Sequence, residues 1–270
     1  MINWYDTAML PKYERPPVVE AAMAIEFAPV PGLDFFKLTR LQSKWEDRYP
    51  DITEVPGAPP TPTESDNQIA FALSINGAGP RRIWAAGRDS GLLVQSQDDR
   101  LILNWRKAPS PGEYPGYFES LRDEFSRLWG ILTAFLAETG LPAPIPLLAE
   151  YNYVNAVPLD PDDAMEDVVT IVRIPEQELP GENRFTQFQM VRDVKQSDTD
   201  PYTTHIQIMG EPQRALDGSR QAVFTVVARA LLGAKSDNPF DGLDAAHALA
   251  SNTFARIVAD EKQEQWGRIK

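Results

Sequence analysis

The chain has 270 residues, of which 43% are hydrophobic and 24% are charged, values close to those of soluble globular proteins. Its net charge is −13, so the overall field repels phosphate backbones and anionic membranes and favours basic partners. The sequence contains no cysteine, which excludes disulfides, thiolate metal sites and cysteine nucleophiles. We expect no cofactor.

The N-terminal residues Met1–Thr7 lack the basic region and the apolar core of a signal peptide. No apolar run approaches the ~20 residues that a transmembrane helix needs. The lack of cysteine also fits a reducing compartment. We therefore expect a cytoplasmic protein with no membrane partner.

The first half of the chain is predicted to hold an opening strand, a short helix and a meander of strands. The segment Pro11–Pro17 must be extended because proline fixes φ, and Val18–Phe27 then alternates as a half-buried strand does. A helix is expected from Asp34 to about Tyr49, followed by a proline-rich loop over residues 55–67. Turn residues separate the later β-type runs, which predicts an antiparallel meander. These runs are Gln68–Ile75, Arg81–Ala86, Leu92–Gln97 and Arg100–Arg106.

A long amphipathic helix over Tyr117–Thr139 is predicted to close this half, because apolar residues recur at helical spacing over about five turns. Gly140 stands where such a helix would end. The proline-rich stretch Leu141–Pro146 is the best candidate linker, so we expect an N-terminal half over residues 1–140 and a C-terminal half over residues 141–270.

The second half is predicted to repeat this plan of strands and a closing helix. Residues Asp162–Arg173 fit a helix and a strand equally well. A closing helix is expected over Leu243–Glu264. The expected strands are Leu147–Val157, Phe185–Val194, Tyr202–Met209 and Gln221–Ala230.

Two strand segments, Pro17–Phe27 and Leu147–Val157, echo each other, with Glu20 matching Glu150 at an offset of 130 residues. Each leads a half that ends in a long amphipathic helix. Because such a helix and a half-polar sheet cover each other, the pattern predicts an α+β protein of two related halves, each an antiparallel sheet backed by one long helix.

The two histidines are the main candidates for chemistry. His205 lies in a predicted strand near Asp198 and Asp200, which could supply a carboxylate–histidine pair, although a structural histidine is the favoured interpretation. His247 borders the buried stripe of the closing helix, where packing and a backbone hydrogen bond explain it. Two histidines without cysteine give no zinc spacing, so we expect no metal site.

Carboxylates gather at two kinds of position. Glu20, Glu26 and Glu150 lie on polar strand faces, where cross-strand arginines such as Arg82 or Arg106 would pair with them. The acidic run Asp160, Asp162, Asp163, Glu166 and Asp167 lacks the pattern of a calcium loop and fits a solvated turn and a helix N-terminus. No phosphate-binding loop, nucleophile elbow or dinucleotide fingerprint occurs, and we assign no catalytic residue.

The segment Tyr13–Ala21, with Ala246-His247, Phe254–Ile257 and Trp266-Gly267, resembles a sporadically distributed bacterial family of unassigned activity. That family has an N-terminal Pro-Pro-(Val/Ile)-x-Glu signature and a C-terminal helix with an Ala-His or Leu-His step. The resemblance implies a cytoplasmic bacterial protein and brings no catalytic residues. It points to Pro16, Pro17, Glu20 and His247 as candidate binding residues, beside Glu150 and His205.

The shortage of reactive groups, the acidity and the duplicated plan favour a non-catalytic binding or regulatory protein. Its partner would be another protein, with a basic surface favoured, or a second copy of the chain. One alternative is a hydrolase or nucleotide-handling enzyme, with carboxylates and His205 or His247 between the halves. The second alternative is nucleic-acid binding through an arginine-bearing sheet, which the net charge disfavours. It would require Arg81, Arg82, Arg88, Arg100 and Arg106 to converge.

Overall fold

We analysed the protein as a computed structural model of the whole chain. The structure describes residues 4–5, 10–59, 61, 81–88, 91–107, 118–160, 162–172, 186–194, 202–215, 217–232 and 238–269. The expected strand Gln68–Ile75 and the residues Asp198 and Asp200 lie outside this part of the chain.

The described residues form a mixed α/β fold with nine strands in one antiparallel sheet and five α-helices. The strand order is β2-β3-β4-β5-β1-β6-β9-β8-β7. The chain divides into two compact units, residues 23–149 and residues 1–22 together with 150–270. The expected division at residues 140 and 141 stays a prediction, and the structure adds that residues 1–22 belong with the C-terminal part.

The unit of residues 23–149 contains the predicted meander and one further strand. Strands β3, β4 and β5 match the predicted runs, and each pairs antiparallel with the next. The additional strand β2 pairs with β3, although the sequence placed its last residues in a loop. The elements are the second part of β1 (Val18–Phe27), α1 (Phe35–Gln42), β2 (Asp51–Pro56), β3 (Arg81–Ala86), β4 (Leu92–Gln97), β5 (Arg100–Arg106) and α2 (Phe118–Glu138).

Helix α1 is shorter than predicted, and its two ends explain why. Asp34 caps the start, because its Oδ1 accepts a hydrogen bond from the Lys37 backbone N–H at 2.9 Å. The chain leaves the helix after Gln42 and buries Trp45 in a turn, where the indole N–H donates to the Gln42 side chain. Trp45 is buried like the apolar residues of α1, but the helix ends at Gln42, before Trp45.

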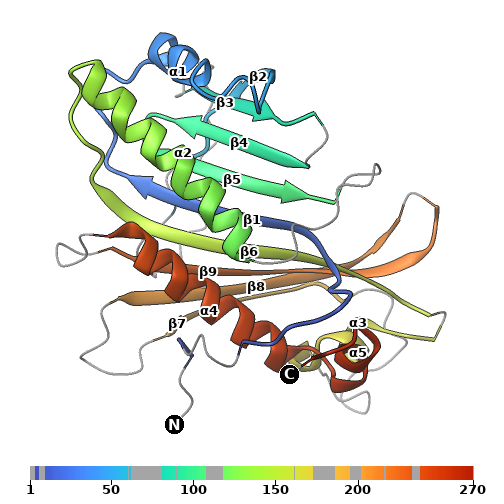
Figure 1. Cartoon of the computed structure of the whole chain (residues 1–270). Coiled ribbons are helices and arrows are strands. Elements are labelled where there is room, and N and C mark those ends of the chain that lie inside the picture. Colours follow the sequence, from blue (N-terminus) through green and yellow to red (C-terminus); the bar gives the residue numbers. More distant parts are fainter. Residues whose placement is uncertain are drawn as a thin grey trace. The chain divides into compact units, whose positions relative to one another are not determined.

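Helix α2 lies on one face of β5 (Figure 1). Phe125 is fully buried as expected, whereas Trp129 is only half-buried and meets the Phe27 ring edge-on at 5.7 Å. The buried side chains of this helix recur every three or four residues. They are Phe118, Leu121, Phe125, Leu128, Leu132, Phe135 and Leu136.

The unit of residues 1–22 and 150–270 joins both ends of the chain. Tyr13 packs edge-on against Phe254 and Trp266, and the Ile269 N–H donates to the Lys12 carbonyl at 2.8 Å. Its elements are the first part of β1, most of β6 (Pro146–Pro158), α3 (Met165–Val168), a 3₁₀ turn (Thr170–Val172), β7 (Phe188–Val194), β8 (Thr203–Arg214), β9 (Arg220–Leu231), α4 (Pro239–Ile257) and α5 (Asp260–Gln265).

The single closing helix expected over Leu243–Glu264 is wrong, because α4 ends at Ile257 and α5 begins at Asp260. Val258 between them is extended and forms a β-bridge with Val169. The ambiguous segment Asp162–Arg173 provides that partner, as a short helix followed by a bridge and a 3₁₀ turn. None of the helices in the described ranges combines the length and the apolar character that crossing a membrane requires.

Candidate functional site

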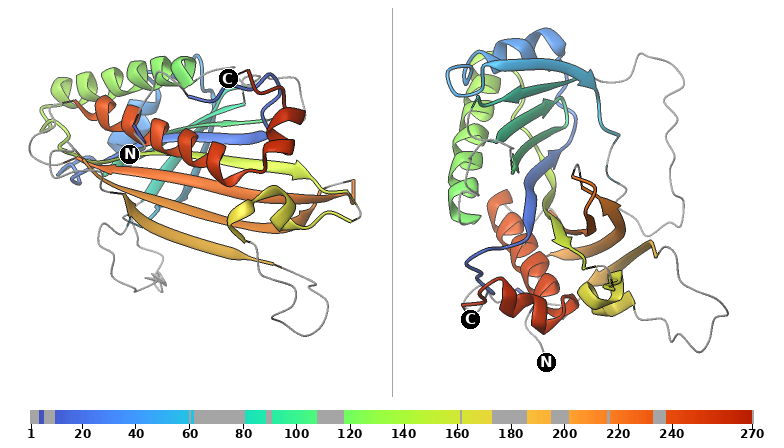
Figure 2. Two further views of the ribbon diagram at one scale, coloured as in Figure 1. Left: turned by 90° about the horizontal axis from the view of Figure 1, so that it is seen from below. Right: turned by 90° about the vertical axis from the view of Figure 1, so that its right-hand side faces the viewer.

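In the unit of residues 1–22 and 150–270, the helices lie on one face of the sheet and leave the other face without a helix among the described residues. Figures 1 and 2 show α4 along one face of the strands β8 and β9. On that face Phe254 of α4 stacks on Phe224 of β9 at 5.9 Å, and Met165 of α3 reaches Gly210 of β8, the cross-strand partner of Phe224. Because side chains alternate along a strand, the neighbours of Phe224 and Gly210 point to the opposite face.

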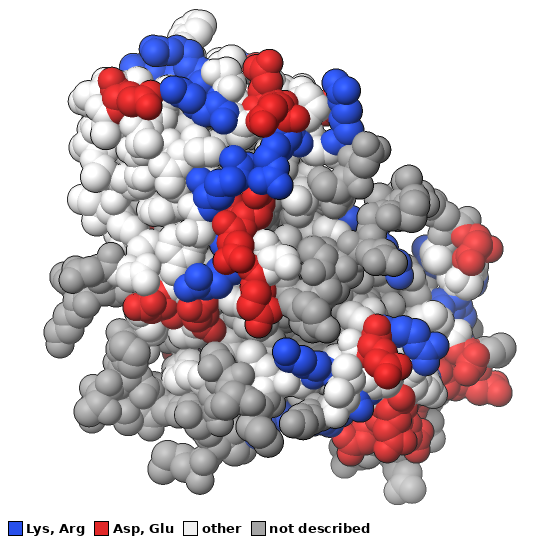
Figure 3. Space-filling model, viewed as in Figure 1, with Lys and Arg blue, Asp and Glu red and all other residues white. Residues whose placement is uncertain are grey.

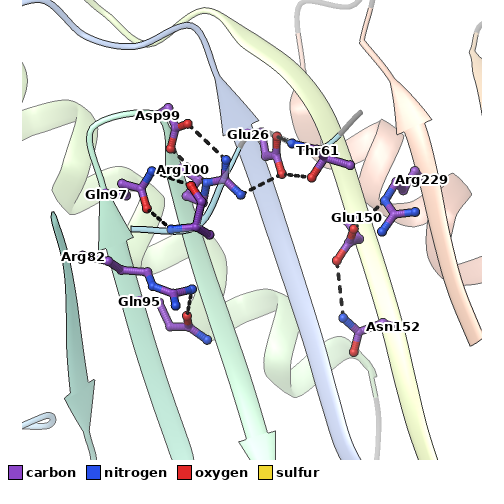
Figure 4. Close-up of polar contacts among 11 residues, drawn as sticks. Glu26, Thr61, Arg82, Gln95, Gln97, Asp99, Arg100, Glu150, Asn152 and Arg229 are labelled. Atoms are coloured by element: carbon purple, nitrogen blue, oxygen red, sulfur yellow. Dashed lines mark hydrogen bonds and ion pairs between the residues drawn. The ribbon is translucent and has the colours of Figure 1, made fainter. Parts of the chain in front are cut away.

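Six polar side chains form a row across this helix-free face, which we name the Arg229 row. Arg229 is its centre, since its Nε lies 2.7 Å from Oε2 of Glu150 (Figure 4). The Arg229 Nη1 donates to Oε1 of Gln207 at 3.0 Å. Asn152 donates to the other oxygen of Glu150 at 3.4 Å. The members are Glu150 and Asn152 of β6, Arg229 of β9, Gln207 and His205 of β8, and Asp193 of β7.

His205 and Asp193 form the second contact of the row. His205 is the cross-strand partner of both Arg229 and Asp193, so all three side chains lie on the same face. The His205 Nδ1 lies 2.6 Å from Oδ1 of Asp193, whereas its Nε2 is buried and makes no hydrogen bond to any described residue. The row thus brings together the predicted candidates Glu150 and His205.

Part of the charge of the row is compensated within it. Glu150 and Arg229 each keep 19% of their side-chain surface exposed and neutralise one another, and the Asp193 carboxylate lies beside the His205 ring. The prediction that an arginine of another strand pairs with Glu150 is confirmed, but this arginine is Arg229 and not Arg82 or Arg106. Such a row can present fixed donors and acceptors to a bound molecule.

His247 lies elsewhere in this unit, in an aromatic setting. Its Nε2 is 3.1 Å from the Tyr153 hydroxyl, and its ring meets Tyr151 edge-on at 5.0 Å. Burial lowers the pKa of His247 to about 3, so the imidazole is neutral at physiological pH. These contacts favour the packing interpretation of His247, with a tyrosine hydroxyl where a backbone group was expected.

The three N-terminal candidates lie at the entry to β1. The Pro17 carbonyl accepts a hydrogen bond from the Ala156 N–H at 3.0 Å, and Pro16 follows Arg15, whose N–H donates to the Trp266 carbonyl at 3.0 Å. Glu20 is half-buried within β1. The structure therefore places Pro16 and Pro17 between a bend at Glu14–Arg15 and the start of β1, so the segment Pro11–Pro17 is not extended throughout as expected.

The acidic run forms a turn and the start of α3, as the sequence indicated. Asp163 pairs with Lys262 of α5 at 2.9 Å, and Asp167 accepts a hydrogen bond from the Ala164 N–H at 2.7 Å. Figure 3 shows acidic side chains gathered over α3 and α5. Within the described residues, no group of three or more histidine, aspartate or glutamate side chains is arranged to hold a metal ion.

The unit of residues 23–149 has its own polar cluster, the Arg100 cluster, defined as Glu26, Thr61, Asp99 and Arg100. Arg100 donates to Oε1 of Glu26 at 3.1 Å and to both carboxylate oxygens of Asp99, and Thr61 also bonds to Glu26 (Figure 4). Arg100 is thus the cross-strand partner of Glu26, in place of the expected Arg82 or Arg106.

The arginines of this unit do not all face one way. Ile83 pairs with Ser96, so their neighbours Arg82 and Gln97 share the opposite face of the sheet. Gln97 in turn pairs with Arg100, and Arg82 and Arg100 therefore lie on the same sheet face. Arg81 points to the other face, where it pairs with Glu54 and lies 6.0 Å from the Phe35 ring centroid.

The sequence interpretation missed Arg229, Gln207 and Asp193. Arg229 did leave a signal, since it is the one charged residue in the apolar run Ala222–Leu232. A charge within a strand of that kind indicates a paired or functional side chain. Asp193 and Gln207 could not be recognised from the sequence, because their position beside His205 and Arg229 depends on the register of the strands.

No family model, curated protein or solved structure matches the chain. The function is therefore inferred from the geometry of the described residues.

Proposed function

We propose that the chain is a non-catalytic binding protein whose partner is another protein, docked on the helix-free face that carries the Arg229 row. The supporting observation is that this face combines partly exposed apolar side chains with polar and charged ones. Val154, Met209 and Thr225 are half-buried, and Val191 on the edge strand β7 is 60% exposed. A mixed polar and apolar surface is typical of non-obligate protein interfaces.

The partner is proposed to be basic. Among the residues that the structure describes, this face carries the carboxylates of Glu150, Asp193 and Glu211 and one guanidinium, that of Arg229. The chain as a whole has a net charge of −13. Both features attract a basic surface, and the association rate is expected to fall as salt rises.

A matched pair of lysine substitutions tests this proposal. Val191→Lys places a cation on the proposed face, and Ile52→Lys makes the same change at a 50%-exposed residue of β2 in the other compact unit. Thr225→Lys is a second variant at the centre of the face. The partner is first recovered from the native host at low salt and then purified, so that its affinity for each variant can be measured.

We expect Val191→Lys and Thr225→Lys to weaken binding at least about tenfold, and Ile52→Lys to bind as the wild type does. Recovery of the chain without any partner at low salt would count against the proposal. Equal binding by all three variants would place the contact elsewhere. Size-exclusion chromatography tells binding to another protein from binding to a second copy of this chain.

An enzyme is the second candidate, because Asp193 holds Nδ1 of His205 and leaves Nε2 without a described partner. This arrangement is typical of a general base that is oriented by a carboxylate. The reaction would be hydrolysis. The test uses p-nitrophenyl acetate and p-nitrophenyl phosphate. His205→Gln should abolish turnover with little change in Tm, whereas His247→Gln should mainly lower Tm.

Nucleic-acid binding is retained as the lowest-ranked proposal. The opposite orientation of Arg81 and the carboxylate partners of Arg100 both weigh against a continuous basic face. A gel-shift at ~50 mM salt would reveal phosphate contacts, since they are strongest when counterions are scarce.

We also propose that the chain arose by duplication of a strand–helix–meander–helix half. The order of elements supports this once β2 and the 3₁₀ turn are set aside, since β1-α1-β3-β4-β5-α2 then has the same sequence of types as β6-α3-β7-β8-β9-α4. The sheet order β3-β4-β5-β1 and its counterpart β7-β8-β9-β6 correspond in the same way. The bacterial family resemblance stays a prediction beside it.

A further inference from the structure

Arg82 of β3 is a partly desolvated cation whose positive charge has no carboxylate partner among the described residues. Its Nη1 donates to Oε1 of Gln95 at 2.7 Å, which is a neutral acceptor. Its Nε is buried and bonds to no described residue. Burial, reinforced by the positive charge of Arg100, lowers the pKa of Arg82. The other arginine of this face, Arg100, has two carboxylates.

Trp84 adds a second buried donor beside Arg82. The two residues stand two apart on β3 and share a face, and the Arg82 guanidinium carbon lies 5.5 Å from the centroid of the Trp84 ring. The Trp84 indole N–H is also buried without a described partner. The Arg82 Nε–H and the Trp84 indole N–H are thus both buried, and neither donates to an acceptor among the described residues.

Amide side chains hold this pair in place. Gln95 is the cross-strand partner of Trp84, and its Nε2 donates to Oδ1 of Asn104 at 2.6 Å while its oxygen accepts from Arg82. Gln95 and Asn104 are both buried. The guanidinium therefore has a fixed orientation, which lowers the entropic cost of binding an anion.

A buried donor without a partner destabilises the fold, because it has lost its hydrogen bonds to water and gained none in the protein. A partly buried charge without a counter-ion destabilises the fold further. Groups of this kind are rare in native proteins, and a bound ion is one of the explanations for them.

We propose that Arg82 and Trp84 form a binding site for a small oxyanion, a phosphate or a carboxylate, held by the Arg82 Nε–H and the Trp84 indole N–H. The anion would supply the missing charge and both missing acceptors. A charge-assisted guanidinium–oxyanion contact is among the stronger polar contacts in proteins.

Titration of the whole protein with inorganic phosphate, and separately with acetate, tests the site and distinguishes the two sources of the anion. Chloride keeps the ionic strength constant, and calorimetry and tryptophan fluorescence report binding. The variants are Arg82→Gln, Arg82→Lys and Trp84→Phe. Arg81→Gln is the matched control, because it removes an arginine from the other face of the same strand.

We expect at least one of the two anions to bind, with a Kd raised tenfold or more in Arg82→Gln and Arg82→Lys and several-fold in Trp84→Phe, but unchanged in Arg81→Gln. In chloride alone, Arg82→Gln should melt at the wild-type temperature or above it, because it removes a charge that lacks a counter-ion. Three results would each overturn the proposal: binding of neither anion, equal binding by Arg82→Gln, or equal loss in Arg81→Gln.

Discussion

The Nε atom of Arg229 lies 2.7 Å from Oε2 of Glu150, and the two charges are held between β9 and β6 with most of their surface covered. Removing one partner leaves the other charge partly buried. We expect Glu150→Gln and Arg229→Gln each to cost about 1–3 kcal/mol of unfolding free energy.

The double variant of this pair should cost about 1 kcal/mol less than the sum of the single variants, because the residues act together. Urea denaturation of the four proteins measures this coupling. Lys44→Gln is the control, since its ion pair with Glu138 is exposed and should contribute less than about 1 kcal/mol. Strict additivity of the two substitutions would show that Arg229 and Glu150 are energetically independent.

His247 is predicted to make stability depend on pH. Burial lowers its pKa from 6.5 to about 3, so the unfolded chain takes up a proton between these values before the folded protein does. The contribution of neutral His247 to the free energy of unfolding is complete above pH 6.5. It is lost as pH falls towards 3, at no more than about 1.4 kcal/mol per pH unit.

Urea midpoints measured from pH 4 to pH 7 test this dependence. His247→Phe should flatten the curve in that range. Tyr153→Phe removes the hydrogen bond to Nε2 of His247 but keeps the His247 ring buried. The urea midpoint of this variant should therefore depend on pH as that of the wild type does. Parallel curves for the wild type and His247→Phe would refute the prediction.

Glu124 of α2 is predicted to control the acid end of the stability curve. Burial alone would raise its pKa, but hydrogen bonds from Arg127 and Tyr49 outweigh burial and hold the pKa below 4.5. Its contribution is therefore present above pH 4.5 and is lost as pH falls below that value. Glu124→Gln should cost about 1–3 kcal/mol at pH 7 and much less at pH 3.

Tyr49→Phe, which removes one of these hydrogen bonds, should show the same trend with a smaller amplitude. Thermal unfolding at pH 7 and pH 3 distinguishes the two variants. A cost of Glu124→Gln that is the same at both pH values would mean that the substitution acts through packing.

Two glycines should respond in opposite directions to alanine. A Cβ at Gly210 would lie 2.6 Å from Cε of Met165 and 2.9 Å from Cβ of Phe224, so Gly210→Ala should destabilise by about 1–3 kcal/mol. Gly130 lies in α2 with open space at the Cβ position, so Gly130→Ala should stabilise by about 0.5–1 kcal/mol. Calorimetry on both variants tests this. A stabilised Gly210→Ala would mean that α3 does not pack on β8 as described.

Local pattern was sufficient to predict the position of α2 and every strand except β2, because period-two and helical spacing are properties of the segment itself. The predicted strands Leu147–Val157 and Phe185–Val194 correspond to β6 and β7. Local pattern was insufficient where a contact with a residue far away in the sequence determines where a helix ends. The break between α4 and α5 depends on Val169, which takes Val258 into a bridge. No feature of residues 243–264 alone reports that partner.

The candidate site shows the same limit. Glu150 and His205 could be selected one at a time from strand patterns. Their common face depends on Arg229 and on the register of β8 with β9. Asp193, two strands away from Arg229, becomes the partner of His205 only after that register is set.

The joining of the two chain ends in one compact unit has a consequence for synthesis on the ribosome. Residues 12–15 hydrogen-bond with residues 265–269, the last described part of the chain. Residues 23–149 lie between these partners in sequence and form a unit of their own. That inner unit can therefore fold before residues 265–269 are synthesised, whereas residues 12–15 must wait for those residues before they can form these hydrogen bonds.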